Sequence, residues 1–288
     1  MSLVINTNVG ALSAQRNLAS SSMALNNSLQ KLSSGYKINR AADDAAGLRI
    51  SETLRTQIRG SQKGLQNLQD GNNMLNIVEG SYSTIQDSLQ RMRELVVQAA
   101  NDTNSNTERQ AIDQELAQLK TNITQVSEST AFNGKNLMRG SYSNFRIQLG
   151  ANSASANNTI NIGSIQQKAS YGVLVSAGGG FGANGTITTS GRSYGQMSKL
   201  IDALDAAISK VGVRRALIGA YQNRLDNAAQ NTSIRIQNFT ASESAIRNVD
   251  VATESSNMTR FQILQQAGVS VLAQSNNSSQ LALQLLRG

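Results

Sequence analysis

The two ends of this chain carry almost no charge, and this limits what they can fold into. No Asp, Glu, Lys or Arg occurs from Phe261 to Leu286, and Arg16 and Lys31 are the only charged residues up to Tyr36. Chain ends of soluble proteins are usually polar and poorly ordered unless other parts of a protein hold them. We therefore expect both ends to pack against protein, including neighbouring copies of the same chain.

Apolar residues recur at both ends with helical spacing. Near the N-terminus they are three, four or seven positions apart, at Ala11, Ala14, Leu18, Leu25, Leu29, Leu32 and Tyr36. Near the C-terminus, one row with seven-residue spacing is Leu264, Val271, Ser278 and Leu285, beside a second row of Phe261, Gly268, Ser275 and Ala282. This is the repeat of a coiled coil. Because we expect both ends to pack against neighbouring copies of the chain, these rows also supply the residues predicted to carry polymerisation. They are Leu18, Leu25, Leu29, Leu32, Phe261, Leu264, Val271 and Leu285.

The uncharged C-terminal stretch does not have the composition of a membrane span. It contains eight Gln and Asn side chains between Gln262 and Gln284, whose amides would be costly to bury in hydrocarbon. The N-terminal "MSLVINTNVG" lacks a basic start and a long apolar core, so we expect no Sec-type signal peptide. We predict no membrane insertion.

Between the ends, three further series of apolar residues with helical spacing, called stripes here, predict long helices. The first runs from Leu54 to Val96 and predicts a helix from near Asp44 to Ala100, on the order of 80 Å at about 1.5 Å per residue. The turn-forming "NDTNSNTE" follows, with Thr107 and Gln110 as a possible capping box. The second stripe is Ile112, Leu116, Leu119, Ile123 and Val126, and the third runs from Ile201 to Phe239. Together they predict a helical bundle.

The middle of the chain has a different composition. Eleven of the 23 glycines lie between Gly140 and Gly195. Short alternating runs, "FRIQLG", "NTINIG" and "TITTSG", indicate strands joined by turns, one of them at Asn184-Gly185. We predict a small β region, with a disordered linker over 170–192 as the alternative. The expected fold is thus mainly α, a long antiparallel helical bundle or coiled-coil rod built from both chain ends, with a small glycine-rich β region.

Composition argues against catalysis. The chain has no Cys and no His, so it lacks thiol chemistry and the usual general base and metal ligand. "GFGANG" is followed by a strand-like run and not by a phosphate-binding helix, and "GRSYG" around Ser193 has no His to activate the serine. "SLQK", with Ser28 and Lys31, is an ordinary helix spacing. We predict no catalytic residue, cofactor site or metal site.

The net charge of +8 raises the question of nucleic-acid binding. Residues 40–139 carry 11 basic and 12 acidic side chains, whereas residues 140–288 carry 12 basic and 6 acidic ones. The excess is spread thinly, and no run of basic residues alternates with aromatic ones. We interpret it as a solvated surface and predict no nucleic-acid partner.

Several longer segments resemble the bacterial flagellins, the subunits of the flagellar filament. These are "INTNVGALSAQRNL" and "LSSGYKINRAADDAAGLRIS" near the N-terminus and "IRNVDVATESSNMTRFQILQQAGVSVLAQSN" near the C-terminus. "RMRELVVQAAN" and "AFNGKNL" are similar to the helical region of that family. The resemblance covers most of residues 1–139 and 197–288 and leaves the middle unmatched, which implies a reduced outer domain.

The resemblance implies a filament subunit used in swimming motility. Residues 1–42 and 243–288 would form the filament core, 43–139 and 197–242 the helical bundle, and 140–196 a short variable outer region. The terminal helices would be disordered in the monomer and fold on assembly. The implied location is the extracellular filament, reached through the flagellar type III apparatus. The implied partners are other copies of the chain, an export chaperone, and cap and hook-junction proteins.

The resemblance also implies a patch for the Toll-like flagellin receptor of animals, at Arg91, Leu95 and Glu115. Each could instead serve the fold, since Leu95 is adjacent to stripe residue Val96 and the two charged residues can be solvated or face a neighbouring subunit. Two other functions stay open at this point. A hook-filament junction protein would assemble only a short ring, and a secreted adhesin with a helical stalk would bind through residues 140–195.

Overall fold

The structure, a computed structural model, describes residues 8–139, 145–152, 158–162 and 188–285. Two compact units can be distinguished: both chain ends, 1–56 and 237–288, belong to the first, and residues 57–236 form the second. The expected mainly α fold with a small antiparallel β region is confirmed. The three-part division at residues 43, 140, 197 and 243 stays a prediction.

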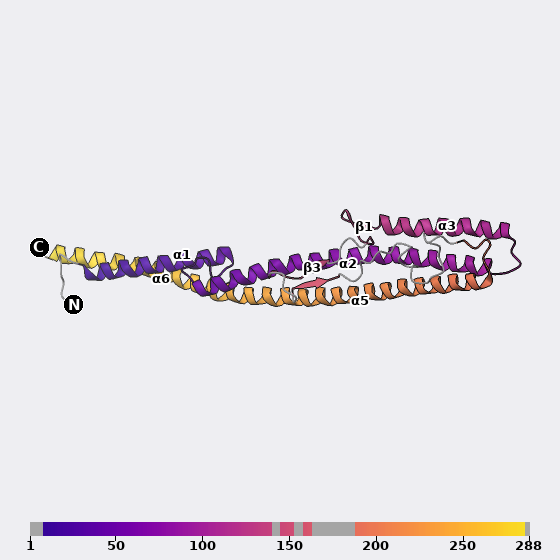
Figure 1. Ribbon diagram of the computed structural model, residues 1–288. Coiled ribbons are helices and arrows are strands. Elements are labelled where there is room, and N and C mark those ends of the chain that lie inside the picture. The colour runs from indigo at the N-terminus through magenta and orange to yellow at the C-terminus, as the bar shows by residue number, and fades with distance from the viewer. Residues whose placement is uncertain (1–7, 140–144, 153–157, 163–187, 286–288) are drawn as a thin grey trace. The chain divides into compact units, whose positions relative to one another are not determined.

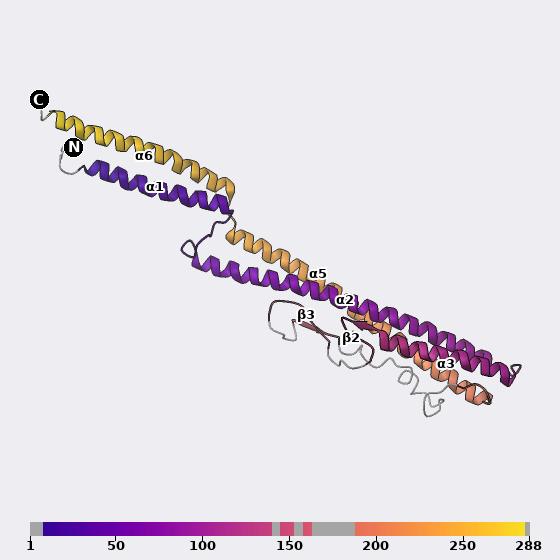
Figure 2. The same cartoon turned by 90° about the horizontal axis from the view of Figure 1, so that it is seen from above.

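The first unit contains two long helices that lie side by side, α1 (Val9–Ser34) and α6 (Val251–Leu285) (Figures 1 and 2). The Asn8 side chain caps α1 by accepting a hydrogen bond from the backbone N–H of Ala11. Gly35 ends the helix with φ of 75°, a left-handed conformation that glycine adopts without strain. Sequence signals therefore fix both ends of α1.

Three helices build the second unit: α2 (Ala45–Ala99), α3 (Asn106–Ser129) and α5 (Tyr194–Arg247). Helix α3 lies wholly within the unit, whereas the unit boundaries fall inside α2 and α5. The helix predicted from Asp44 to Ala100 is confirmed as α2. The predicted capping box was wrong by two positions. The N-cap of α3 is Ser105, whose hydroxyl accepts from Glu108 N–H while the Glu108 carboxylate accepts from Ser105 N–H.

Polar pairs fix the antiparallel register of α2 and α5. As the residue number rises along α2, that of its partner on α5 falls: the pairs are Asn72 with Asp226, Asn76 with Gln222, Glu79 with Arg215, and Arg93 with Asp205. Helix α3 runs beside α2 in both views, and its pairs with α2 are also antiparallel (Figures 1 and 2). The predicted stripes meet between these three helices.

The core of the second unit consists of these stripes. Leu75, Ile85, Leu89, Met92 and Val96 of α2 are fully buried or nearly so. They lie in one cluster with residues of the other two helices, among them Leu116, Ile123, Leu200, Leu204, Val211 and Ile218. Burial of such side chains stabilises a fold by about 1.5–3 kcal/mol each. This core holds the second unit together.

Two short antiparallel ribbons pack in the second unit. Strands β3 (Arg146–Gln148) and β4 (Thr159–Asn161) pair as "FRIQLG" and "NTINIG" predicted. Of "TITTSG", residues 188–191 form no strand, and 186–187 lie outside the described residues, as do Asn184-Gly185 and most of 170–192.

The segment "AFNGKNL" lies between the helices of the second unit and is not itself helical. It forms a hairpin of β1 (Ala131–Phe132) and β2 (Lys135–Asn136), joined by Asn133 and Gly134 with φ of 47° and 72°. Asn-Gly between apolar residues is the usual signal of such a two-residue turn. The signal was present in the sequence.

Glycines on α2 let the β3–β4 ribbon approach the helix closely. A Cβ at Gly64 would lie 2.1 Å from the Leu149 carbonyl oxygen, and one at Gly71 would lie 2.2 Å from the Ile147 side chain. Only a residue without a side chain allows the strand backbone this near. The glycines therefore place the ribbon on α2.

Candidate functional site

The catalytic-looking motifs have ordinary structural roles where they are described. Ser193 lies directly before α5, where its carbonyl accepts hydrogen bonds from the backbone N–H groups of Gln196 and Met197. Ser28 is 3% exposed on α1, and Lys31 lies in its last turn. "GFGANG" falls outside the described residues. Within the described segments, no acidic cluster could hold a metal ion, and no helix there could cross a membrane.

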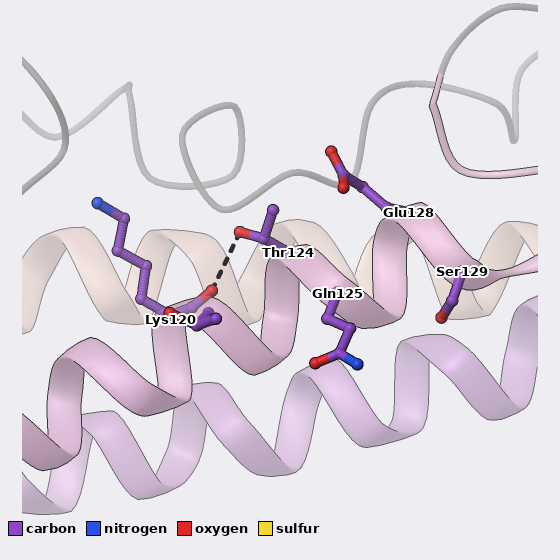
Figure 3. Close-up of a pocket in the computed structure, with 6 residues that line it drawn as sticks. Lys120, Thr124, Gln125, Glu128 and Ser129 are labelled. Carbon is purple, nitrogen blue, oxygen red and sulfur yellow. Dashed lines mark hydrogen bonds between the residues drawn. The ribbon is translucent and has the colours of Figure 1, made fainter.

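A shallow hollow lies along α3, lined by Lys120, Thr121, Thr124, Gln125, Glu128 and Ser129 (Figure 3). All six residues belong to one helix, and the Thr124 hydroxyl donates to the Lys120 carbonyl of the same helix. Converging groups from several elements are typical of ligand sites. The hollow offers no such convergence among its lining residues.

Small and polar residues bring α1 and α6 together. Asn8 Nδ2 donates to the Ser275 carbonyl at 3.1 Å, and a Cβ at Gly268 would lie 3.3 Å from the Leu18 side chain. Ala14 is the only fully buried apolar residue on the described parts of the two helices. The row that includes Gly268 and Ser275 therefore faces α1.

The residues predicted to carry polymerisation fall into two groups. Those half-buried in the first unit are Leu18, Leu25, Leu32 and Phe261. Leu29, Leu264 and Val271 are 44%, 47% and 58% exposed. Leu285 lies in the last turn of α6, where side chains fall outside the described part. The row of Leu264 and Val271 thus stays uncovered by α1.

Uncovered apolar side chains are concentrated in the first unit. Eleven of the sixteen large apolar residues that are exposed in the described chain belong to it, although it is the smaller unit. On the two terminal helices they are Val9, Leu12, Met23, Leu29, Val251, Ile263, Leu264, Val269 and Val271. A helix that is apolar on several sides is normally covered by other protein. The pair of α1 and α6, called here the terminal helix pair, thus carries an apolar surface that the described chain leaves uncovered.

A cluster around Arg247 joins three segments of the first unit and was missed from the sequence. The Arg247 guanidinium lies 4.6 Å from the centre of the Tyr36 ring, and its Nη1 donates to Glu52 at 2.8 Å. Backbone bonds add to this contact: Lys37 N–H donates to the Arg247 carbonyl, and Val249 N–H donates to that of Gly35. The cluster fastens the end of α1 to the break between α5 and α6 and to α2. Its parts are far apart in sequence, so no spacing rule predicts it.

Carboxylates hold the turns around this cluster. Asp250 caps α6, and hydrogen bonds from the Thr253 hydroxyl and from the N–H groups of Thr253 and Ala252 lower its pKa. Asp43 accepts the N–H groups of Arg40 and Asn39, which lower the pKa of its carboxyl. Hydrogen bonds from Arg55 and Arg247 lower the pKa of Glu52. All three groups are therefore held in their charged forms.

The residues of the resemblance-based receptor patch lie together on α2 and α3. Arg91 Nε donates to Glu115 at 2.9 Å, and both side chains are about half exposed. Hydrogen bonds to Glu115 and then Glu94 raise the pKa of Arg91. Leu95 is 2% exposed and belongs to the core. The structure brings the two charged residues to the surface and leaves Leu95 beneath it.

These features define a class of protein. Two long terminal helices carry uncovered apolar side chains and few charges, while a well-packed bundle follows in the second unit. Such an arrangement is typical of a subunit that is completed by copies of itself.

Comparison with known proteins identifies the family. Residues 5–143 match the bacterial flagellin N-terminal helical region, and residues 201–286 match the bacterial flagellin C-terminal helical region. Flagellin FlaB2 of Treponema pallidum is 36% identical over 289 residues, which cover 99% of this chain and 100% of that protein. The flagellin of Bacillus subtilis is 38% identical over 308 residues, covering 98% and 99%. This chain belongs to the bacterial flagellin family.

A solved structure shows a related fold. The putative flagellar hook-associated protein from Vibrio parahaemolyticus superposes with a TM-score of 0.57 at 14% identity, over 72% of this chain and 100% of that chain. At this identity the likeness concerns the fold alone. Full-length similarity to flagellins makes the chain a structural subunit that polymerises into the extracellular flagellar filament, and not an enzyme.

Proposed function

We propose that the terminal helix pair is the polymerisation element of this subunit. The observation that carries the proposal is the uncovered apolar surface on α1 and α6, where Leu264 and Val271 are about half exposed. Neighbouring subunits would cover this row, while Gly268 and Ser275 hold α6 against α1. The near absence of charge on these helices suits the contact, because a charge covered by a neighbouring subunit would have to be desolvated and paired.

The contact between subunits has to be head-to-tail. An interface in which both subunits use the same patch closes at a dimer, whereas a filament requires two different complementary surfaces on each subunit. The terminal helix pair offers separate outward rows on α1 and α6, such as Leu12 with Met23 and Leu264 with Val271. These rows are our candidates for the two complementary surfaces.

The same sparse burial supports folding upon assembly. Ala14 and Ile38 are the only apolar residues of the first unit that are fully buried in its described part. Ordering a residue costs about 1–2 kcal/mol of backbone entropy, which so little burial does not offset. The terminal helices would therefore be largely disordered in the free subunit. An unfolded chain suits export through the flagellar type III apparatus with a chaperone, followed by addition under a cap on a base of hook-junction proteins.

Seeded assembly tests the polymerisation element. Purified full-length chain and a version ending at Arg260 are each added to short filament fragments and observed by negative-stain electron microscopy. We expect long filaments from the full chain and none from the shortened one. Growth of the shortened chain would show that α6 is dispensable. A full chain that stops at short rings would favour a junction protein.

A second role, recognition by the Toll-like flagellin receptor of animals, is favoured by the paired Arg91 and Glu115. The pair presents a polar surface across α2 and α3, with Leu95 packed below it. A receptor-reporter assay compares Arg91→Ala with Arg93→Ala, a matched control whose ion pair with Asp205 links α2 to α5. We expect a loss of signalling only for Arg91→Ala. Equal signalling from both variants would show that Arg91 does not take part in the receptor contact.

A further inference from the structure

The methionines of this chain differ sharply in exposure. Four lie in the core of the second unit and are at most 2% exposed: Met74, Met92, Met138 and Met197. Met258 is half-buried on α6, and Met1 lies outside the described residues. Met23, on α1, is 63% exposed. A thioether this open to solvent is accessible to small oxidants, whereas the four core sulfurs are shielded.

Met23 is the only large apolar side chain exposed on α1 between Leu12 and Leu29, a range that the structure describes in full. Eleven positions, about three turns at about 3.6 residues each, separate it from Leu12, which places both on one side of α1. Leu12 is 55% exposed, and Val9, on the same side, is 66% exposed.

Arg16 and Lys31 are the only charged residues of α1. Arg16 falls on the same side, seven positions before Met23, and exposed Ser20 and Asn27 flank Met23 on the helix surface. A sulfoxide at Met23 would therefore remove the apolar group from an otherwise polar stretch of α1.

We propose that Met23 is an oxidation site of the free subunit and that its sulfoxide hinders assembly. The oxidant class is a peroxide. The Met23 sulfur attacks one peroxide oxygen, the O–O bond breaks, and hydroxide leaves. The proton on the transferred oxygen passes to this hydroxide to give water, and the sulfur keeps the oxygen. The sulfur is oxidised, and hydrogen peroxide is reduced to water. The product is a polar sulfoxide in place of a flexible apolar side chain.

The effect on assembly rests on the proposed role of the terminal helix pair. A neighbouring subunit that covers Met23 would lose an apolar contact and would have to desolvate the sulfoxide oxygen, which is costly where no hydrogen-bond donor replaces water. The terminal helix pair has little buried surface of its own to compensate. The second unit keeps its fold, because its core methionines are shielded from the oxidant.

The first part of the test locates the oxidation. Purified full-length subunits receive a limited dose of hydrogen peroxide, and peptide mapping by mass spectrometry follows each methionine. We expect an added oxygen at Met23 at doses that leave Met74, Met92, Met138 and Met197 intact. Oxidation of these core residues at the same rate as Met23 would overturn the assignment.

The second part measures assembly from seeds by the oxidised subunits. We expect elongation about tenfold slower than for untreated subunits, since a poorly paired polar group costs on the order of one decade in binding. Met23→Leu, a swap of similar volume that removes the oxidisable sulfur, should elongate at the same rate with and without peroxide treatment. Met258→Leu is the matched control and should remain as sensitive as the wild type.

The outcomes separate this inference from the polymerisation proposal. Normal elongation by subunits oxidised at Met23 would overturn the inference alone, and so would equal peroxide sensitivity of Met23→Leu. Normal growth of the chain ending at Arg260 would instead overturn the proposed role of the terminal helix pair. Met23→Gln, which carries a polar group without oxidation, should also elongate slowly and provides an independent check.

Discussion

At the scale of single residues, Asp113 accepts four hydrogen bonds from the segment before α5. Its carboxylate accepts the N–H and hydroxyl of Thr189 at 2.5 and 2.7 Å, and those of Ser190 at 3.1 and 2.8 Å. Thr189 is fully buried, and its hydroxyl also lies 3.1 Å from the Arg109 carbonyl. Asp113 thereby ties α3 to the segment that leads into α5.

Removing this carboxylate should lower stability. We expect Asp113→Ala to reduce the free energy of unfolding by about 1–3 kcal/mol, because the buried N–H of Thr189 loses its acceptor. Urea unfolding followed by circular dichroism measures the change. Gln114→Ala, at the exposed neighbouring position, should stay within about 0.5 kcal/mol. Equal losses in both variants would mean that the helix alone, and not the hydrogen bonds, is affected.

Acid should weaken the start of α6 through Asp250. Hydrogen bonds from Thr253 and Ala252 lower the Asp250 pKa in the folded state. The stabilisation is complete above the unfolded pKa of about 3.9 and is lost as the pH falls through the lower folded value. A carboxyl-carbon NMR titration of assembled subunits should place Asp250 below an ordinary aspartate. In Asp250→Asn, the part of the acid sensitivity that arises from this cap should vanish.

At the scale of elements, the sequence predicted the helices well because apolar spacing reports directly on a buried stripe. Residues such as Leu75, Leu89 and Leu116 fall in the core as expected. The hairpin at Asn133-Gly134 was not predicted although its turn signal is present, because strands were expected only in the glycine-rich segment 140–196. Which row of α6 faces α1 could not be predicted, since both rows have the same seven-residue period.

The residues predicted to carry polymerisation could also be predicted only in part. The spacing identified Leu264 and Val271, but their exposure depends on Gly268 and Ser275 occupying the contact with α1. The cluster of Arg247, Tyr36 and Glu52 depends on long-range folding and leaves no local pattern.

Two glycines of α2 should respond oppositely to the same change. Gly64→Ala places a methyl group against the Leu149 carbonyl, so we expect a loss of about 1–3 kcal/mol in unfolding free energy. Gly80→Ala meets nothing within 4 Å in the helix interior and should gain about 0.5–1 kcal/mol. Thermal unfolding of both variants measures the difference. A loss at Gly80 as large as at Gly64 would contradict the close approach of β3 to α2.

At the scale of the whole molecule, burial divides the chain into a stable and a marginal part. The second unit holds nearly all of the described apolar core, whereas the first holds Ala14 and Ile38. Local stability follows buried contacts, so the two parts should open with different free energies. A filament subunit can use this difference, since the marginal part gains its stability from neighbours.

Hydrogen exchange can measure this division within one helix. Helix α5 crosses the unit boundary after Ile236, so its amides near Val211 and Ile218 should exchange far more slowly in the free subunit than those beyond residue 237. Amides of α1 and α6 should exchange as fast as the α5 amides beyond residue 237. In assembled filaments, all these regions should become protected, because neighbours then cover the terminal helix pair. Equal protection of both parts of α5 in the free subunit would show that the chain ends are stable before assembly.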